Sequence, residues 1–226
     1  GLDRGIDFVQ IKSPLIFFSD QTGNIGTVYT AAHWKGRLYI GTNQGVFSRP
    51  DTGTPIQGKA LMTGGLFKLV EGSQGQVWQL KVFGDQLLCG HNGGTFVIEN
   101  NTARKVSEVT GGWHTTFAPG RSDLLVQSTY TGLVLFKWRK EGGWGFNGRV
   151  AGFQEPLKRI AFDPKGYLWG SHPSRGLLRL RLSADFSTVL GIQTFSEADG
   201  LPTDYQLDVT QMDGDVFVNV APAALR

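Results

Sequence analysis

The sequence predicts an all-β protein built from four-stranded β-propeller blades. Three observations lead to this prediction. A pattern of short apolar runs and turns recurs with a period of about 45 residues, which is the length of one propeller blade. Glycine is abundant, with 32 in 226 residues, as expected for many tight turns between short strands. No segment keeps a helical apolar stripe over about 11 residues, which argues against helical repeats.

The predicted blades follow one another along the chain and span residues 26–71, 76–108, 113–155 and 157–197. A small residue or an amide ends the second strand of each repeat, at Gly41, Gly90, Gln127, Gly170 and Asn219. A fifth, composite blade combines residues 206–226 with an outer strand from residues 8–18, and would close a five-blade ring. The alternative is an open fragment of a larger propeller.

Each repeat has the same internal order. An inner strand alternates between its two faces, and a Lys-Gly, Gly-Asp or Asp-Gly turn then reverses the chain. The second strand is nearly all apolar, because both of its faces are expected to pack against neighbouring blades. The outer strand is more polar and less regular. The predicted outer strands are residues 66–70, 105–108, 149–153 and 190–195.

The net charge of +3 is unevenly distributed. Residues 121–181 contain eleven basic and four acidic residues, whereas residues 182–226 contain one basic and seven acidic residues. Solvated strand faces explain this pattern, and a basic sector that attracts an anionic ligand is the alternative. No nucleic-acid-binding motif accompanies the charge, so no nucleic acid partner is expected. The single Cys89 excludes an intramolecular disulfide, and no apolar stretch is long enough to span a bilayer.

Several motifs resemble the two-component-regulator propeller repeat, whose pattern is roughly D-x-x-G-x-[LI]-W-[IV]-G-T-x-x-G-[LI]. The matching segments are DPKGYLWGSHPSRG at residues 163–176, KGRLYIGTNQGVF at residues 35–47, and the inter-blade phrase FSEADGLPTD at residues 195–204. The sequence departs from the pattern at Gln127 and Asn219, where the family has glycine, and at Ser171, where it has threonine.

This resemblance implies a periplasmic sensor portion of a bacterial regulator, with the signalling module elsewhere in the parent protein. Such sensors often respond to polysaccharide fragments, so an oligosaccharide is the expected ligand. The resemblance brings no catalytic residue and no cofactor with it, and a repeat identifies a fold more reliably than a ligand.

The propeller topology indicates where a ligand would bind. Loops between second and third strands share one face with the blade-to-blade connections. Aromatic rings beside amide and guanidinium donors suit sugars or acidic sugars. The candidate ligand-binding residues on this face are Asn43, Gln44, His91, Asn92, Trp113, His114, Tyr130, His172, Arg175, Asp204 and Tyr205. The alternative is that they are ordinary polar loop residues.

Other conspicuous side chains receive simpler interpretations. Trp78 and Trp169 lie in apolar strands and are expected to be packing residues, whereas Trp138 and Trp144 flank Gly142-Gly143 as surface aromatics. His91 and His172 occupy equivalent loops but lack a third ligand nearby in sequence, so no metal site is predicted.

Three functional classes remain open at this point. A ligand-sensing module is the preferred one, and a protein-interaction or homodimerisation scaffold is the second. A propeller glycoside hydrolase or lyase is the third, and it would need two carboxylates facing each other across the site. Asp85 and Asp163 fall in hairpins of the opposite face, while Glu197, Asp204 and Asp208 share one segment. No G-x-S-x-G motif is present, so the sequence favours a non-catalytic protein.

Overall fold

The computed structural model describes residues 25–51 and 67–220, which form five antiparallel sheets. The first sheet contains β1 (Val28–Trp34), β2 (Arg37–Thr42), β3 (Val46–Pro50) and β4 (Lys68–Leu69). The second contains β5 (Val77–Phe83), β6 (Gln86–His91), β7 (Gly94–Glu99) and β8 (Thr102–Ser107). The third contains β9 (His114–Phe117), β10 (Leu124–Thr129), β11 (Gly132–Arg139) and β12 (Gly143–Arg149). The fourth contains β13 (Ile160–Phe162), β14 (Leu168–Ser171), β15 (Leu177–Leu182) and β16 (Val189–Phe195).

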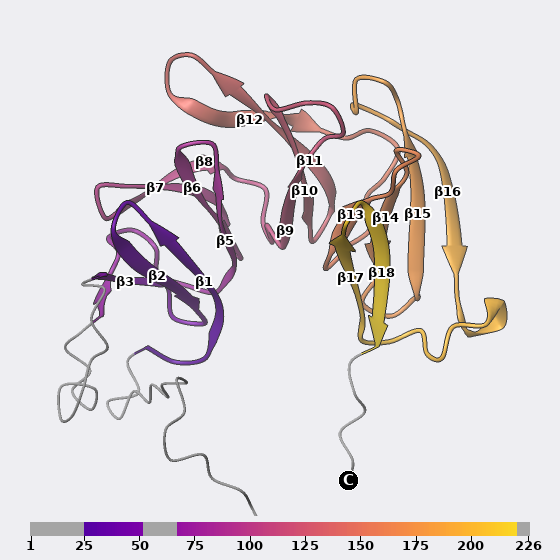
Figure 1. The fold of residues 1–226 in the computed structure, drawn as a ribbon, viewed down its shortest axis with the longest axis horizontal. Coiled ribbons are helices and arrows are strands. Elements are labelled where there is room, and N and C mark those ends of the chain that lie inside the picture. The colour runs from indigo at the N-terminus through magenta and orange to yellow at the C-terminus, as the bar shows by residue number, and fades with distance from the viewer. Residues whose placement is uncertain (1–24, 52–66, 221–226) are drawn as a thin grey trace, which may run out of the picture.

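The fifth sheet has two strands, β17 (Leu207–Met212) and β18 (Asp215–Val220), and follows a short 3-10 helix, η2 (Glu197–Asp199). The five sheets are arranged in an arc, with the first strands β1, β5, β9, β13 and β17 toward its concave side (Figure 1). In each sheet, consecutive strands are hydrogen-bonded neighbours. The predicted all-β propeller fold is therefore confirmed.

Tight two-residue turns connect the inner strand to the second strand in the first, second and fifth sheets. Lys35 and Gly36 have φ values of 46° and 68°, and Asp213 and Gly214 have φ values of 51° and 89°. Two consecutive positive φ angles match the right-handed twist of the flanking strands, which explains why the sequence uses Lys-Gly and Asp-Gly here.

The hydrophobic core lies between consecutive sheets rather than within any one of them. Four clusters of buried side chains join the first sheet to the second, the second to the third, the third to the fourth and the fourth to the fifth. Every residue of β6 and of β10 is buried, because both faces of these strands pack against neighbouring sheets. Cys89 is one of them, and its burial raises the pKa of the thiol.

Close contact between sheets explains the small residue at the end of the second strand. A Cβ atom added at Gly90 would lie 2.0 Å from the carbonyl oxygen of Gly112, in the connection to the next sheet. Gln127, at the equivalent position in the third sheet, is fully buried and bridges two sheets. Its amide accepts a hydrogen bond of 2.8 Å from Thr95 and donates one of 2.9 Å to Thr115.

The structure corrects several predicted boundaries. The outer strand of the third sheet is β12, not residues 149–153, because positive φ angles at Gly142 and Gly143 turn the chain back at once. Trp144 is therefore not a surface aromatic. It is 2% exposed, and its indole nitrogen donates a 2.9 Å hydrogen bond to the carbonyl of Phe83.

The other predicted boundaries differ less. The outer strand of the second sheet begins at Thr102, and β13 covers only the second half of the predicted inner strand. The outer strand of the fourth sheet, β16, agrees with the prediction. Residues 8–18, Leu66 and residues 221–226 lie outside the described part of the chain, so the composite blade stays a prediction.

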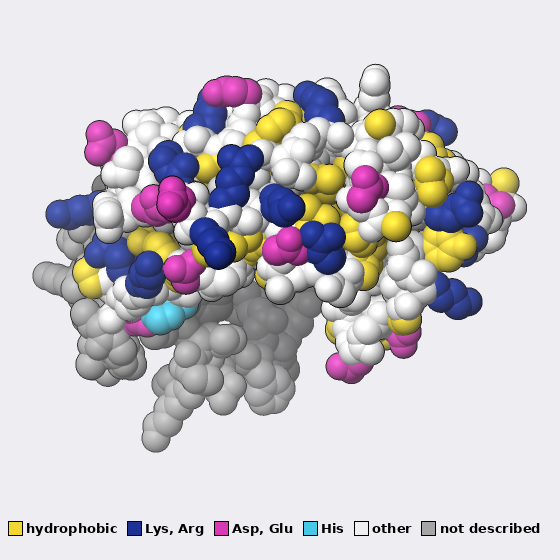
Figure 2. Space-filling model, turned by 90° about the horizontal axis from the view of Figure 1, so that it is seen from above, with side chains coloured by type: hydrophobic (Ala, Val, Ile, Leu, Met, Phe, Trp, Pro, Cys, Tyr) yellow, Lys and Arg dark blue, Asp and Glu magenta, His cyan; other side chains and the backbone are white. Residues whose placement is uncertain are grey.

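The surface in Figure 2 carries Lys and Arg side chains interspersed with Asp, Glu and hydrophobic side chains. This mixture is typical of solvated strand faces rather than of one continuous basic field. Within residues 25–51 and 67–220, no helix is long and apolar enough to cross a membrane.

Candidate ligand-binding site

Four aromatic side chains from three consecutive sheets form one cluster on the face that carries the connections between sheets. The ring centroids of Trp113 and Tyr130 are 4.9 Å apart, in an edge-to-face arrangement. Trp78 lies 6.1 Å from Trp113 and 6.4 Å from Tyr130, and Tyr29 lies 5.9 Å from Trp78. We call Tyr29, Trp78, Trp113 and Tyr130 the aromatic cluster.

β-Bulges place two members of this cluster. In the pairing of β1 with β2, the register shifts between Val28 and Thr30, so that Tyr29 is the extra residue. The pairing of β5 with β6 shifts in the same way around Trp78. A bulge re-aims the side chain of its extra residue, and here it does so at equivalent positions of two repeats.

The third sheet supplies the other two members. Trp113 directly precedes β9, and Tyr130 lies in the turn between β10 and β11. Gly111 makes room for the Tyr130 ring, since a Cβ atom there would lie 2.2 Å from it, and its φ of +78° also favours glycine. The indole nitrogen of Trp78 donates a 3.0 Å hydrogen bond to the Tyr130 hydroxyl, which fixes both rings.

The aromatic cluster combines a rigid base with an accessible ring. Tyr29 is 47% exposed, whereas Trp78, Trp113 and Tyr130 are half-buried. Burial raises the pKa of the Tyr130 hydroxyl, and its hydrogen bond with Trp78 acts in the opposite direction. Fixed rings with an exposed partner can stack against the apolar face of a sugar ring at a low entropy cost.

Basic side chains surround His114, the residue next to Trp113. Burial, followed by the positive charges of Arg159 and Lys81, lowers the pKa of His114 to about 3. Its buried Nδ1 atom has no hydrogen-bond partner in the part of the chain that the structure describes. Arg159 pairs with Asp208 of β17 at 3.4 Å. His114 is thus a neutral side chain next to the cluster.

Asn43 and Asn92 have the same role in two repeats. Asn43 Oδ1 accepts a 2.8 Å hydrogen bond from the Thr27 amide, and Asn92 Oδ1 accepts a 3.2 Å bond from the Gln76 amide. Each side chain therefore fixes the segment that leads into the inner strand of its own sheet. Gln44, next to Asn43, is exposed.

His91 and His172 are also equivalent. The Nδ1 atom of each accepts a hydrogen bond from the backbone amide two residues later, at 2.9 Å from Gly93 and at 3.1 Å from Ser174. Both rings are buried, and burial lowers the pKa of each. Within the described ranges, no group of three or more His, Cys, Asp or Glu side chains is placed to hold a metal ion.

The remaining predicted residues are engaged in the fourth sheet and in the connection to the fifth. Arg175 forms an ion pair with Glu155, and His172 Nε2 lies 3.6 Å from the same carboxylate. Asp204 Oδ1 accepts a 2.8 Å hydrogen bond from the Glu197 amide, which stabilises the inter-blade turn. Tyr205 is 58% exposed and belongs to the connection that leads into β17, away from the aromatic cluster.

The aromatic cluster thus contains two of the eleven predicted residues, Trp113 and Tyr130, with His114 beside them, while His172 and Arg175 meet at the Glu155 carboxylate. Sequence reasoning missed Tyr29 and interpreted Trp78 as a packing residue. The signal that could have found them is a repeated pair at the start of the inner strand, Val28-Tyr29 and Val77-Trp78. An aromatic side chain at the same position of two repeats must lie on the same face of two neighbouring sheets.

Comparison with solved structures agrees with a β-propeller. The chain is similar to the extracellular domain of the putative one component system BT4673 from B. thetaiotaomicron, with 12% identity, a TM-score of 0.58, and coverage of 92% of this chain and 27% of that chain. It is also similar to the extracellular domain of the putative hybrid two component system BT3049 from B. thetaiotaomicron, with 14% identity, a TM-score of 0.59, and coverage of 88% and 28%. The WD40 beta propeller domain of Doa1 gives 14% identity, a TM-score of 0.51, and coverage of 84% and 60%.

The resemblance to the propeller repeats of regulator sensors is confirmed at the level of the fold. The chain spans about a quarter of the length of the two sensor domains. No protein-family model matches the sequence, and no curated protein sequence matches it.

Proposed function

We propose that this chain is a non-catalytic ligand-sensing propeller that recognises a carbohydrate at the aromatic cluster. The observation that carries the proposal is the meeting of four aromatic rings from three sheets on one face, with Tyr29 exposed and the other three fixed by mutual packing. Sugar rings present apolar C–H faces that stack on such rings, while their hydroxyls bind nearby polar loops.

The state of the carboxylates on this face supports a sensor over a hydrolase. Glu155 pairs with Arg175, Asp208 pairs with Arg159, and Glu197 and Asp204 bond to each other's backbone amides. Glycoside hydrolysis needs one carboxyl with a raised pKa opposite a second one. Carboxylates that already have cationic or amide partners are better suited to stabilising loops than to acting as the acid or the nucleophile of glycoside hydrolysis.

We also propose that the chain belongs to the extracytoplasmic, periplasmic part of a bacterial regulator, whose remaining domains are its partner. The similarity to two extracellular domains of putative regulatory systems supports this placement, together with the motifs at residues 35–47, 163–176 and 195–204.

Calorimetric titration with neutral and acidic oligosaccharides tests the proposal, followed by analysis of each mixture for cleavage products. We expect saturable binding without products. Tyr29→Ala should weaken binding roughly tenfold, in line with loss of one stacking ring. Tyr205→Ala, which removes an exposed tyrosine outside the cluster, should leave it unchanged. Cleavage of any oligosaccharide would instead establish the hydrolase or lyase alternative.

A homodimerisation scaffold is the second candidate, and β18 is the observation that favours it. The fifth sheet has two strands within the described part of the chain, and Phe217, Val218 and Val220 of β18 are exposed. An unpaired apolar edge strand can pair with another chain. Sedimentation over a range of concentrations tests this, and a monomer throughout would exclude self-association.

A further inference from the structure

A polar groove lies between the first and second sheets, on the face opposite the aromatic cluster. Its volume is about 700 Å³, within the range of small-molecule sites. It is built from the Lys35-Gly36 turn between β1 and β2, the Gly84-Asp85 turn between β5 and β6, and the Asn100-Asn101 turn between β7 and β8. Trp34 and Tyr39 are its aromatic lining and are almost fully buried.

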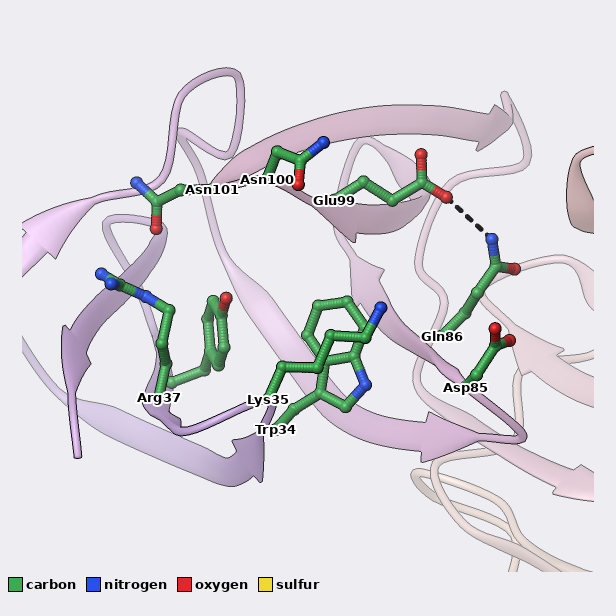
Figure 3. A pocket seen from close by; sticks show the side chains of 9 residues that line it. Trp34, Lys35, Arg37, Asp85, Gln86, Glu99, Asn100 and Asn101 are labelled. Carbon is green, nitrogen blue, oxygen red and sulfur yellow. Dashed lines mark hydrogen bonds between the residues drawn. The ribbon is translucent and has the colours of Figure 1, made fainter. Parts of the chain in front are cut away.

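The charges along the groove are separated. Figure 3 shows Arg37 and Asn101 at one end, and Asp85, Gln86 and Glu99 at the other. Lys35 lies between them, with its ammonium 4.4 Å from the centre of the Trp34 ring. Within residues 25–51 and 67–220, no ion pair joins Lys35 or Arg37 to Asp85 or Glu99.

The cationic end is fixed in place. The Nη2 atom of Arg37 donates a 3.0 Å hydrogen bond to the Ser48 hydroxyl, which in turn donates to Asn101. Among the described residues, the buried Nε atom of Arg37 has no hydrogen-bond partner. The Nε atom itself is shielded from solvent, so a ligand carboxylate at this end would pair with the rest of the guanidinium of Arg37, which lines the groove.

The acidic end is fixed as well. Gln86 donates a 2.7 Å hydrogen bond to Glu99, and its carbonyl oxygen accepts a 2.9 Å bond from the Trp144 amide of the third sheet. Arg104 lies 3.5 Å from the same Glu99 oxygen. Asp85 is exposed in the neighbouring turn. Two carboxylates thus face the groove at this end, one held by Gln86 and one open to solvent.

We propose that this groove binds a short peptide with free termini. The C-terminal carboxylate would pair with Arg37, the N-terminal ammonium would pair with Asp85 and Glu99, and Lys35 would bind peptide carbonyls between them. A ligand with opposite charges at its two ends matches this order, whereas a neutral sugar leaves the groove charges unpaired. The site lies on the opposite face from the carbohydrate site and does not depend on it.

Ligand-observed NMR and calorimetry with Gly-Gly, Gly-Gly-Gly and Ala-Ala-Ala provide the test, with the N-acetylated and C-amidated form of each peptide as matched controls. We expect the free peptides to bind and each single cap to weaken binding roughly tenfold, through loss of one charge-assisted interaction. Asp85→Asn should weaken binding of the free peptide but not of its acetylated form. Asp213→Asn, in the equivalent turn of the fifth sheet, should have no effect.

Three results would contradict a peptide site in this groove. Absence of binding at about 10 mM of every free peptide would overturn the proposal. So would equal binding of free and capped peptides, or displacement of the peptide by a neutral oligosaccharide. Because Asp85 is exposed and the capped peptides need no protein variant, a folding defect cannot account for these results.

Discussion

The indole nitrogen of Trp78 donates a 3.0 Å hydrogen bond to the hydroxyl of Tyr130, 52 residues further along the chain. Trp78 is the extra residue of a bulge in β5, and Tyr130 lies in a turn of the next sheet. One contact therefore joins two sheets and positions two rings of the aromatic cluster. Packing between the two sheets and the proposed carbohydrate site therefore involve the same pair of residues.

Tyr130→Phe should remove this hydrogen bond while keeping the ring. We expect the free energy of unfolding to fall by about 1 kcal/mol, since both partners are half-buried. Urea denaturation measures this, and Tyr205→Phe is the control, because Tyr205 is exposed. An equal loss in both variants would mean that the contact with Trp78 contributes no stability.

Gly90→Ala should destabilise the protein by about 2–3 kcal/mol, because the new Cβ atom would lie 2.0 Å from the Gly112 carbonyl and force two sheets apart. Gly191→Ala is the matched control in a strand, since its Cβ atom would lie 3.9 Å from the nearest atom outside its chain neighbours, the Arg181 Nε. Thermal unfolding of the two variants measures the difference. Similar melting temperatures would contradict the close contact at Gly90.

The buried bridge at Gln127 gives a third prediction. Gln127→Leu should cost about 2–3 kcal/mol, because the hydroxyls of Thr95 and Thr115 would both lose a partner inside the interface between the second and third sheets. Gln154→Leu, at an exposed position, should be nearly neutral. Chemical denaturation measures both, and a neutral Gln127→Leu would show that the amide bridge is dispensable.

His114 should make stability depend on pH. Its pKa is about 3 in the folded protein, owing first to burial and then to Arg159 and Lys81, and about 6.5 in an unfolded chain. Below pH 6.5 the unfolded state gains a proton that the folded state does not, so stability falls as pH decreases, by up to about 1.4 kcal/mol per pH unit. Above pH 6.5 His114 is neutral in both the folded and the unfolded state, so it no longer makes the free energy of unfolding depend on pH.

His114→Gln should reduce, but not abolish, the pH dependence of stability between about pH 6.5 and pH 5, where ordinary carboxylates titrate little, because burial also lowers the pKa of His91 and of His172. Denaturation curves of both proteins across this range provide the measurement. An NMR titration of the His114 ring provides a second measurement. Protonation of the His114 imidazole near pH 6 in the folded protein would refute the prediction.

The composite blade can be tested directly. If residues 8–18 add an outer strand to the fifth sheet, a chain without residues 1–24 should show faster amide exchange in β18 and unchanged exchange in β10. Hydrogen exchange with mass spectrometry resolves the two strands. Unchanged exchange in β18 would indicate that another segment or partner completes this sheet.

Periodicity made the propeller predictable, because every repeat must bury a second strand between two neighbours and reverse the chain with positive φ angles. The Lys35-Gly36 and Asp213-Gly214 turns and the fully buried β6 follow from this local rule. The outer strand of the third sheet was misplaced, since Trp144 next to two glycines has no local feature that distinguishes a buried hairpin strand from a surface loop.

The sequence by itself determined the all-β class, the repeat and the face on which Trp113 and Tyr130 lie, because alternation and turn chemistry are local properties. Tertiary structure alone decided that bulges direct Tyr29 and Trp78 into the same cluster, that Asn43 and Asn92 fix the backbone before the inner strands, and that Arg37 lies at the opposite end of one groove from Asp85 and Glu99 (Figure 3). These relationships depend on how neighbouring sheets pack and twist against each other, and that packing brings together residues far apart in the chain.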